Sequence, residues 1–355
     1  SSQSPELVIV ETSTIEDGFT DRLGVLAGNC SENTSAVVIG PVNDVYLYRN
    51  LIDMGVSDYL VRPVTKDVLA QVVSKTLIEK FGAPESKLIA LVGAKGGVGT
   101  STIAEEIARI SSDRLDQKTI ILDAAGGWSY LAVAMGTEPM TNLGEIARLA
   151  ISTDEGAFKR MIFSSKDKLS VLATGSDGML DDTIGADAFE IVINKLMATY
   201  PVVIVDLSGS TAAIKKMVMS RAHEILLVTT PSLSSLRAAR TLIQEIKNFR
   251  GDAGDNFSLI LNKVGEVSGY EVSKADIEKV MDRKAKISIP YDGKNFGAAE
   301  AQGKSLSDLK TADVIFESLL VFARSILNVK ISSEAKSVDK SVVSGFLSKF
   351  TGKKG

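Results

Sequence analysis

Short runs of branched apolar residues alternate along the chain with longer segments in which apolar residues recur every three or four positions. Such runs are typical of strands buried on both faces, and the longer segments are typical of amphipathic helices. From residue 88 onward the predicted strands are Leu88–Val92, Lys118–Asp123, Lys168–Ala173, Pro201–Asp206, Glu224–Val228, Phe257–Leu261 and Lys286–Pro290. The pattern predicts an α/β fold with a mostly parallel, doubly wound sheet.

The first 80 residues repeat this alternation in shorter units. Strands are predicted at Leu7–Val10, Ala36–Ile39 and Asp58–Val61, and helices at Glu16–Ala27, Val42–Met54 and Thr65–Phe81. Turn-forming residues follow in the sequence FGAPES and indicate a linker. We therefore predict a small α/β domain at 1–80, a linker at 81–86, a larger α/β domain at 87–330 and a polar tail at 331–355.

A glycine-rich turn, Gly93 to Gly99, joins the first strand of the larger domain to a helix. Glycines let backbone N–H groups turn toward an anion, and a helix N-terminus adds partial positive charge. The sequence therefore predicts a phosphate-binding loop composed of Lys95, Gly96, Gly97, Val98, Gly99, Thr100, Ser101 and Thr102. A turn that only packs a strand against a helix is the alternative interpretation.

The loop departs from the usual pattern G-x-x-x-x-G-K-[ST] at two positions. Ala94 replaces the first glycine and Thr100 replaces the lysine, whereas a lysine occurs early, at Lys95. A hydrogen bond to a charged group contributes about 1.5–3 kcal/mol, so losing the usual lysine is expected to weaken nucleotide binding about ten- to a hundred-fold.

The early lysine resembles the deviant Walker A loop, K-G-G-x-G-K-[ST]-[ST], of the MinD/ParA family of dimerising ATPases. The resemblance covers about residues 87–330, and it implies a P-loop fold that binds ATP and Mg²⁺ and forms an ATP-sandwich homodimer. It also implies that Lys95 reaches across the interface to the nucleotide of the partner subunit.

Two predicted strands end in acids that fit the same resemblance. Asp123 matches the first acid of the family's D-x-D motif, and Asp206 closes a segment with the form of a Walker B strand. The resemblance implies that Ser101, Asp123 and Asp206 hold Mg²⁺, with Lys95 and Asp123 as catalytic residues. An aspartate that caps a helix is the alternative interpretation of Asp206.

Hydrolysis of ATP to ADP and phosphate is expected to be slow at most. Ala125 replaces the second acid of the D-x-D motif, and Thr100 replaces the loop lysine. Both changes remove charges that the family uses on the phosphates and on the attacking water, and electrostatic preorganisation provides most of phosphoryl-transfer catalysis.

Residues after the last two strands resemble the adenine side of the family's site. Asn262 is expected to read the adenine edge, and Lys263, Pro290 and Asp292 are expected to contact the nucleotide beside it. A turn residue that ends a strand is the alternative interpretation of Asn262. Gly126–Trp128 and Leu207–Ser210 resemble the two switch loops.

The phrase GVSDYLVRPV, residues 55–64, resembles the end of a two-component receiver domain. Arg62 stands at the position of the receiver lysine, Glu11 at that of the phosphorylated aspartate, and Gly40 near that of the switch hydroxyl. The acidic pair that binds Mg²⁺ in a receiver has no counterpart. The resemblance implies a degenerate, truncated receiver-like (flavodoxin-like) domain used for docking or dimerisation, and an ordinary α/β extension is the alternative.

A receiver-like module before a MinD/ParA-type domain is the arrangement of the CpaE/TadZ proteins, and Thr229–Arg240 (TTPSLSSLRAAR) resembles the matching region of these proteins. The resemblance implies a localisation or assembly factor for a Flp/Tad-type pilus, with components of type II–IV secretion machinery as partners. The alternatives are a membrane-cycling MinD-like ATPase, a ParA-like DNA-partition ATPase and a nucleotide-free pseudo-ATPase scaffold.

The composition of the chain bears on its partners, its disulfides and its metal sites. A net charge of −4 disfavours non-specific binding of DNA through the protein surface as a whole, so we do not expect DNA as a partner. The single cysteine, Cys30, excludes a disulfide framework within the chain and is typical of a reducing cytosol. With only His223 as a histidine, the chain offers little for a zinc site.

The tail contains a short basic segment, residues 341–354. Val343, Phe346, Leu347 and Phe350 would share one face of a helix, with lysines beside them. This resembles the membrane-targeting helix of MinD. It implies a cytoplasmic protein that is peripheral at the inner membrane or cell pole, and docking on a protein surface is the alternative.

Overall fold

The computed structural model describes residues 5–16, 18–31, 34–81, 85–125, 130–152, 154–175, 184–251 and 256–328 of the 355-residue chain. Three sequence-based expectations therefore lie outside the described residues. They are the middle of the predicted linker (82–84), the first predicted switch loop (126–128) and the predicted tail (331–355).

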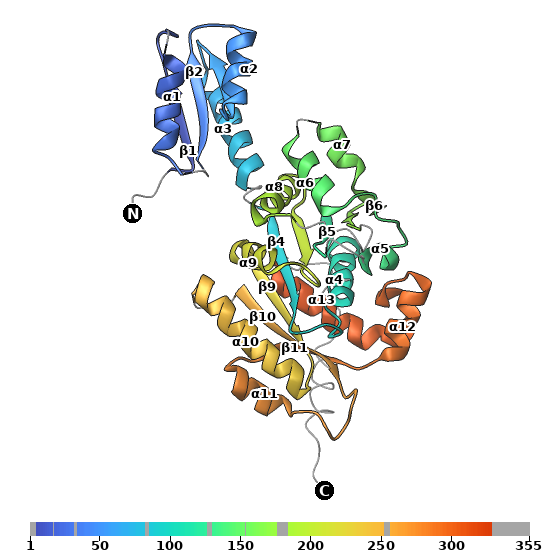
Figure 1. The fold of residues 1–355 in the computed structure, drawn as a ribbon. Helices are drawn as coiled ribbons and strands as arrows, with labels where there is room; N and C mark the ends of the chain where they lie inside the picture. Colours follow the sequence, from blue (N-terminus) through green and yellow to red (C-terminus); the bar gives the residue numbers. More distant parts are fainter. Residues whose placement is uncertain are drawn as a thin grey trace.

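The N-terminal domain is a three-stranded parallel sheet with the order β1-β2-β3 (Figure 1). Its elements are β1 (Leu7–Glu11), α1 (Phe19–Gly28), β2 (Ser35–Gly40), α2 (Val45–Asp53), β3 (Asp58–Val61) and α3 (Lys66–Phe81). Two helices begin three residues later than predicted. Gly18 adopts a left-handed conformation before α1, and the Asp44 carboxylate caps α2 by accepting from the N–H groups of Tyr46 and Leu47.

The larger domain contains an eight-stranded sheet with the order β11-β10-β9-β4-β8-β5-β7-β6. The strands are β4 (Lys87–Gly93), β5 (Thr119–Asp123), β6 (Phe163–Lys166), β7 (Leu169–Leu172), β8 (Val202–Asp206), β9 (Glu224–Thr229), β10 (Phe257–Val264) and β11 (Ala285–Pro290). All neighbours pair in parallel except β6 and β7. The mostly parallel α/β fold is confirmed, and the short edge strand β6 was not predicted.

The helices of this domain are α4 (Thr100–Asp113), α5 (Tyr130–Ala134), α6 (Leu143–Ile151), α7 (Glu155–Arg160), α8 (Ala186–Met197), α9 (Ala212–Arg221), α10 (Leu233–Arg250), α11 (Lys274–Met281), α12 (Gly293–Gln302) and α13 (Asp313–Leu327). Two short 3₁₀ turns, Leu306–Asp308 and Lys310–Ala312, precede α13. The sequence pattern predicts helices at 130–135, 142–150, 155–161, 187–199 and 311–327, but it predicts none over the short helices α9 and α11. Among the described residues, none of the helices combines the length and the apolarity needed to span a bilayer.

The sheet is covered by helices on both faces, with β4 at its centre. Successive side chains of a strand point to opposite faces, so Leu88 and Ala90 join the core formed with α6, α8, α9 and α10. Ile89 and Leu91 join the second core, formed with α4, α5 and α13. Figure 1 shows α3 running from the N-terminal domain toward α8, with which it is in contact. Because β4 is a central strand, the turn that follows it lies near the middle of the edge formed by the carboxyl ends of the parallel strands.

We expect Phe189→Ala to lower the free energy of unfolding of the larger domain by about 3–5 kcal/mol, because it would leave a cavity in a close-packed core. The Phe189 side chain is fully buried on α8. Ile191 lies on the same helix and is 40% exposed, so Ile191→Ala is the matched control, with a loss within about 1 kcal/mol. Denaturant unfolding measures both losses, and equal losses would contradict this packing.

Candidate functional site

The glycine-rich loop lies at the carboxyl end of β4, between β9 and β8. The N–H of Ala94 donates to the carbonyl of Val228 at 2.8 Å, and the N–H of Leu207 donates to the carbonyl of Leu91 at 2.9 Å. These bonds connect the loop region to both neighbouring strand ends. In open α/β sheets, ligands bind at this edge.

Close packing within the domain fixes the shape of the loop. Gly99 has a φ of 89° and caps α4. The Asn262 side chain donates from Nδ2 to the carbonyl of Val98 at 2.7 Å, and a Cβ on Gly99 would lie 2.5 Å from that nitrogen. Gly93 is in direct contact with the Thr100 hydroxyl, where a side chain would clash. The turn therefore requires glycine at both positions.

A cavity of about 400 Å³ opens over the loop. Its lining comprises Gly93, Ala94, Lys95, Gly96, Gly97, Gly99, Thr100, Ser101, Thr102, Tyr130, Leu207, Ser208, Gly209 and Lys215. The volume is in the range of small-molecule sites, about 300–1,000 Å³. The charged residues of this described lining are two lysines, and it contains no carboxylate. Backbone donors at a helix N-terminus beside two cations favour a phosphate-bearing ligand.

The predicted phosphate-binding residues meet at this cavity. Every residue from Lys95 to Thr102 except the buried Val98 contributes to its lining. Lys95 is exposed, and its Nζ lies 3.5 Å from the carbonyl oxygen of Gly96. The Thr100 side chain is 5% exposed and packs under Gly93. The short Thr100 side chain therefore points into the protein. It cannot extend toward a ligand in the cavity as the long lysine side chain of the usual pattern does.

Asp123 and Asp206 lie side by side at the ends of paired strands, in register with one another. Each is 2% exposed, and each Oδ1 accepts an N–H two residues ahead, from Ala125 and Ser208 respectively, at 2.9 Å. Neither carboxylate lines the cavity, whereas Ser101 does. The described residues contain no group of three or more His, Cys, Asp or Glu that could hold a metal ion.

The four residues predicted on the adenine side do not line the cavity. Asn262 is 7% exposed, and its amide is bound to the loop. Asp292 caps α12 by accepting from the N–H of Asn295 at 3.0 Å, and Pro290 ends β11. Lys263 has a left-handed φ of 54°. Their contact with adenine therefore stays a prediction, and the observed role of Asn262 is to hold the loop.

A larger cleft, of about 1260 Å³, lies between α3 and the α7–α8 region. None of the predicted site residues lines it. The small cavity over the loop, which gathers the predicted phosphate-binding residues, is therefore the candidate site.

Two lining residues, Tyr130 and Lys215, were not predicted from the sequence. Tyr130 begins α5, and the Thr102 hydroxyl lies 3.4 Å from its phenol oxygen. Burial raises the pKa of Tyr130 to about 12, so its proton is held at neutral pH. Lys215 lies on the unpredicted helix α9. No local motif marks either residue, because the fold brings each to the cavity from a distant segment.

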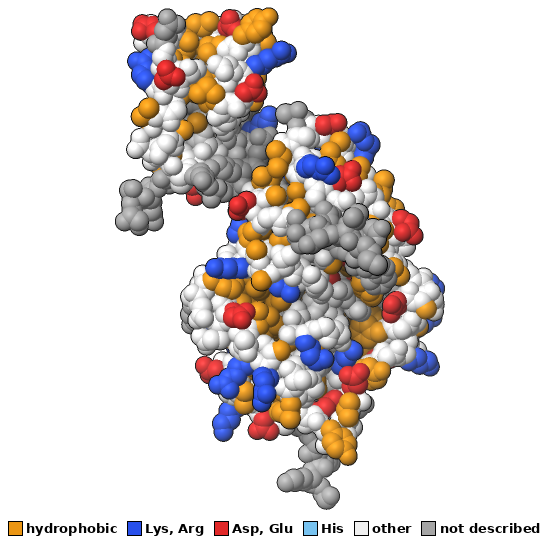
Figure 2. Space-filling model, in the orientation of Figure 1, with side chains coloured by type: hydrophobic (Ala, Val, Ile, Leu, Met, Phe, Trp, Pro, Cys, Tyr) orange, Lys and Arg blue, Asp and Glu red, His pale blue; other side chains and the backbone are white. Residues whose placement is uncertain are grey.

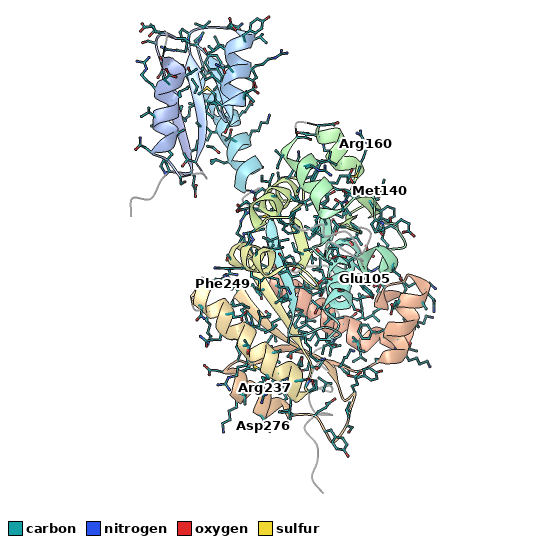
Figure 3. All side chains as sticks on the ribbon, viewed as in Figure 1. Glu105, Met140, Arg160, Arg237, Phe249 and Asp276 are labelled. Atoms are coloured by element: carbon teal, nitrogen blue, oxygen red, sulfur yellow. The ribbon has the colours of Figure 1, made fainter. Side chains whose placement is uncertain are left out.

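Buried charges on α4 connect the loop helix to the rest of the domain. Glu105 accepts from Arg109 at 2.9 Å, and Arg109 donates to the carbonyl of Ala134 in α5 at 3.1 Å. Glu106 accepts from the Ser305 hydroxyl at 3.1 Å and from the N–H of Leu306 at 3.0 Å. Figure 3 shows Glu105 on α4, in the interior of the larger domain. These contacts fix α4 against α5 and the segment before α13.

The sheet order and the glycine-rich loop define an α/β domain with a cavity at the carboxyl end of β4. No family model matches the chain. MinD from Synechocystis sp. is 26% identical over 209 residues, covering 59% of this chain and 75% of that protein. An uncharacterised ATP-binding protein of Methanocaldococcus jannaschii is 23% identical over 268 residues, covering 75% of this chain and 97% of that protein.

Solved structures share the fold at low identity. A ParA family ATPase from Chlorobium tepidum has a TM-score of 0.60 at 24% identity, covering 67% of this chain and 99% of that one. MinD from Pyrococcus horikoshii, in complex with Mg-ADP, has a TM-score of 0.54 at 19% identity and covers 68% and 96%. The McdA–ATP complex from Cyanothece has a TM-score of 0.56 at 18% identity and covers 71% and 100%. The fold is that of MinD/ParA ATPases, and the sequence similarity supports this superfamily.

We expect Gly99→Ala to destabilise the protein in the absence of nucleotide. A side chain in the left-handed region costs about 1–2 kcal/mol, and the added Cβ would also press on the Asn262 amide. Gly96→Ala is the matched control, since open space surrounds that position and its φ is not left-handed. Urea unfolding of both variants tests this, and a Gly99→Ala protein as stable as Gly96→Ala would contradict the observed turn.

Stability should depend on pH through Glu106. Burial raises the pKa of Glu106 from 4.5 to about 7. Between these values the unfolded chain binds fewer protons at this group, so its contribution to the free energy of unfolding falls as pH rises. Glu106→Gln cannot titrate, and its stability relative to the wild type should rise by up to about 3 kcal/mol from pH 4.5 to 7.5. A constant difference across this range would contradict the assignment.

Proposed function

We propose that this chain is a MinD/ParA-type ATPase that binds Mg·ATP at the Gly93–Thr102 loop and dimerises around the nucleotide. The observation that carries the proposal is the cavity over the loop, with backbone donors and two lysines but no carboxylate in its described lining. The P. horikoshii MinD and Cyanothece McdA complexes, which share the fold, contain Mg-ADP and ATP respectively.

In this proposal the N–H groups of residues 96–101 would bind the phosphate oxygens, and the Ser101 hydroxyl would help to hold Mg²⁺. Oxygen ligands and retained waters suit Mg²⁺. Asp123 and Asp206 would help to hold the ion through water, since both are buried and neither lines the cavity. Asn262, Lys263, Pro290 and Asp292 lie on the adenine side. When bound, the metal ion neutralises charge on the phosphates.

Lys95 completes the site of the partner subunit and contributes to catalysis there. Its exposure, and the long 3.5 Å separation between its Nζ and the Gly96 carbonyl oxygen, leave the ammonium group available for such a contact. Slow hydrolysis follows from the two missing charges at Thr100 and Ala125. A Cβ on Gly209 would lie 3.4 Å from the Ala125 side chain, so the Leu207–Ser210 loop packs beside the position of the family's second acid.

We further propose that the protein is a localisation or assembly factor of the CpaE/TadZ type for a Flp/Tad-type pilus. The N-terminal domain supports a docking role without phosphotransfer. Arg62 pairs with Glu11 at 3.5 Å, and Gly40 lies against the Tyr59 ring, with no room for a hydroxyl-bearing side chain. Figure 2 shows hydrophobic side chains on the surface of this domain, and Tyr46 is 84% exposed.

A membrane-cycling MinD-like ATPase is the second candidate, favoured by the sequence similarity to MinD from Synechocystis sp.. Turnover with excess Mg·ATP separates the two proposals. The assembly factor is expected to hydrolyse ATP far more slowly than a cycling ATPase, because both missing charges act on the transition state. A rate comparable with that of active family members would favour the cycling protein.

Calorimetry and sedimentation of the full chain test the binding proposal. We expect saturable binding of Mg·ATP and a doubling of mass with it. Lys95→Ala should bind nucleotide but fail to dimerise, because the residue acts on the partner's nucleotide. Lys279→Ala, which removes an exposed lysine of α11 away from the cavity lining, should behave as the wild type. The absence of binding at millimolar nucleotide would overturn the proposed function.

A further inference from the structure

We propose that Lys215, on α9, binds the nucleotide phosphates in place of the lysine that the loop lacks at position 100. The inference rests on the proposed function, since it concerns the same cavity. It assigns a phosphate-binding role to a residue outside the glycine-rich loop, from the segment that follows β8.

The loop has no charged side chain at position 100, where the usual pattern has a phosphate-binding lysine. Thr100 is buried under Gly93 and carries a short neutral side chain. Lys95, the other lysine of the lining, is exposed at the loop surface and, in the proposed function, contacts the partner's nucleotide. A triphosphate held only by the backbone N–H groups of the loop would therefore contact no cation of the same subunit. Such a cation must come from a helix or strand outside the loop.

Lys215 reaches the cavity from the opposite face of the sheet. α9 packs in the core cluster on one face of β4, and α4 packs in the cluster on the other face. The cavity lies at the edge between them, where Lys215 joins Leu207, Ser208 and Gly209 in its lining. The side chain is half-buried, and within the described part of the chain its ammonium group has no ion pair or side-chain hydrogen bond.

The helix position of Lys215 also favours an anion. Thr211 caps α9 by accepting from the N–H of Ile214 at 3.3 Å, so Lys215 stands in the first turn. That turn contains no acidic residue. A cation near a helix N-terminus is repelled by the partial positive charge of the helix, and an anion is attracted there. A phosphate group bound between the loop and α9 would be attracted by the N-termini of both α4 and α9. It would also offset the repulsion between Lys215 and the N-terminus of α9.

The neighbouring residue provides a matched control. Lys216 has the same charge and lies on the same helix, but it is exposed and does not line the cavity. Replacing either lysine changes the net charge equally, so a difference between the two variants reports the local contact and not the long-range field.

The test is calorimetric titration of the full-length variants with Mg·ATP and Mg·ADP. We expect Lys215→Ala to raise the Kd about ten- to a hundred-fold, as loss of a charged hydrogen bond predicts. Lys216→Ala should stay near the wild-type value, and Lys215→Arg should retain most of the affinity. Adding Thr100→Lys to Lys215→Ala should restore binding, because it returns a cation to the usual loop position.

The outcomes separate this inference from the proposed function. If the wild type binds and Lys215→Ala matches Lys216→Ala, the inference is wrong while the proposed function stands. If the wild type does not bind, both are wrong. Thermal unfolding by circular dichroism checks that each variant is folded, and Lys215→Gln repeats the test with a longer neutral side chain should Lys215→Ala fail to fold.

Discussion

The conformation of one turn determines how the site can work. The left-handed Gly99, the Asn262 amide on the Val98 carbonyl and the contact of Gly93 with Thr100 hold the loop between β4 and α4 in shape. A loop that is already folded does not lose conformational entropy again when it binds a ligand. The backbone of the loop therefore has a fixed shape, and in the proposed function its N–H groups need no rearrangement to bind a phosphate.

In the proposed function, the charges around this turn affect nucleotide binding and hydrolysis differently. The described cavity lining contains lysines and no carboxylate, while Asp123 and Asp206 are buried at the strand ends and do not line it. Such an arrangement favours an anion in the ground state. It provides less of the stabilisation that phosphoryl transfer requires, since Thr100 and Ala125 carry no charge. Under the proposed function, slow hydrolysis of bound ATP suits an assembly role better than rapid cycling.

The sequence predicted the sheet well because its strands are buried on both faces, which leaves continuous branched apolar runs such as that of β8. It missed α9 and α11, which are short, and the polar edge strand β6. The loop residues were found from their local pattern. The partnership of Asn262 with Val98, and the position of Lys215, depend on tertiary packing between segments far apart in the chain, and no local pattern encodes them.

The central claim is that the backbone N–H groups of the loop bind the phosphates of ATP. Hydrogen exchange of the individual amides, with and without Mg·ATP, measures this most directly. The account predicts slower exchange of the N–H groups of residues 96–101 when Mg·ATP is added, and no change with adenosine, which lacks phosphates. Unchanged exchange throughout this segment at millimolar Mg·ATP would contradict the account.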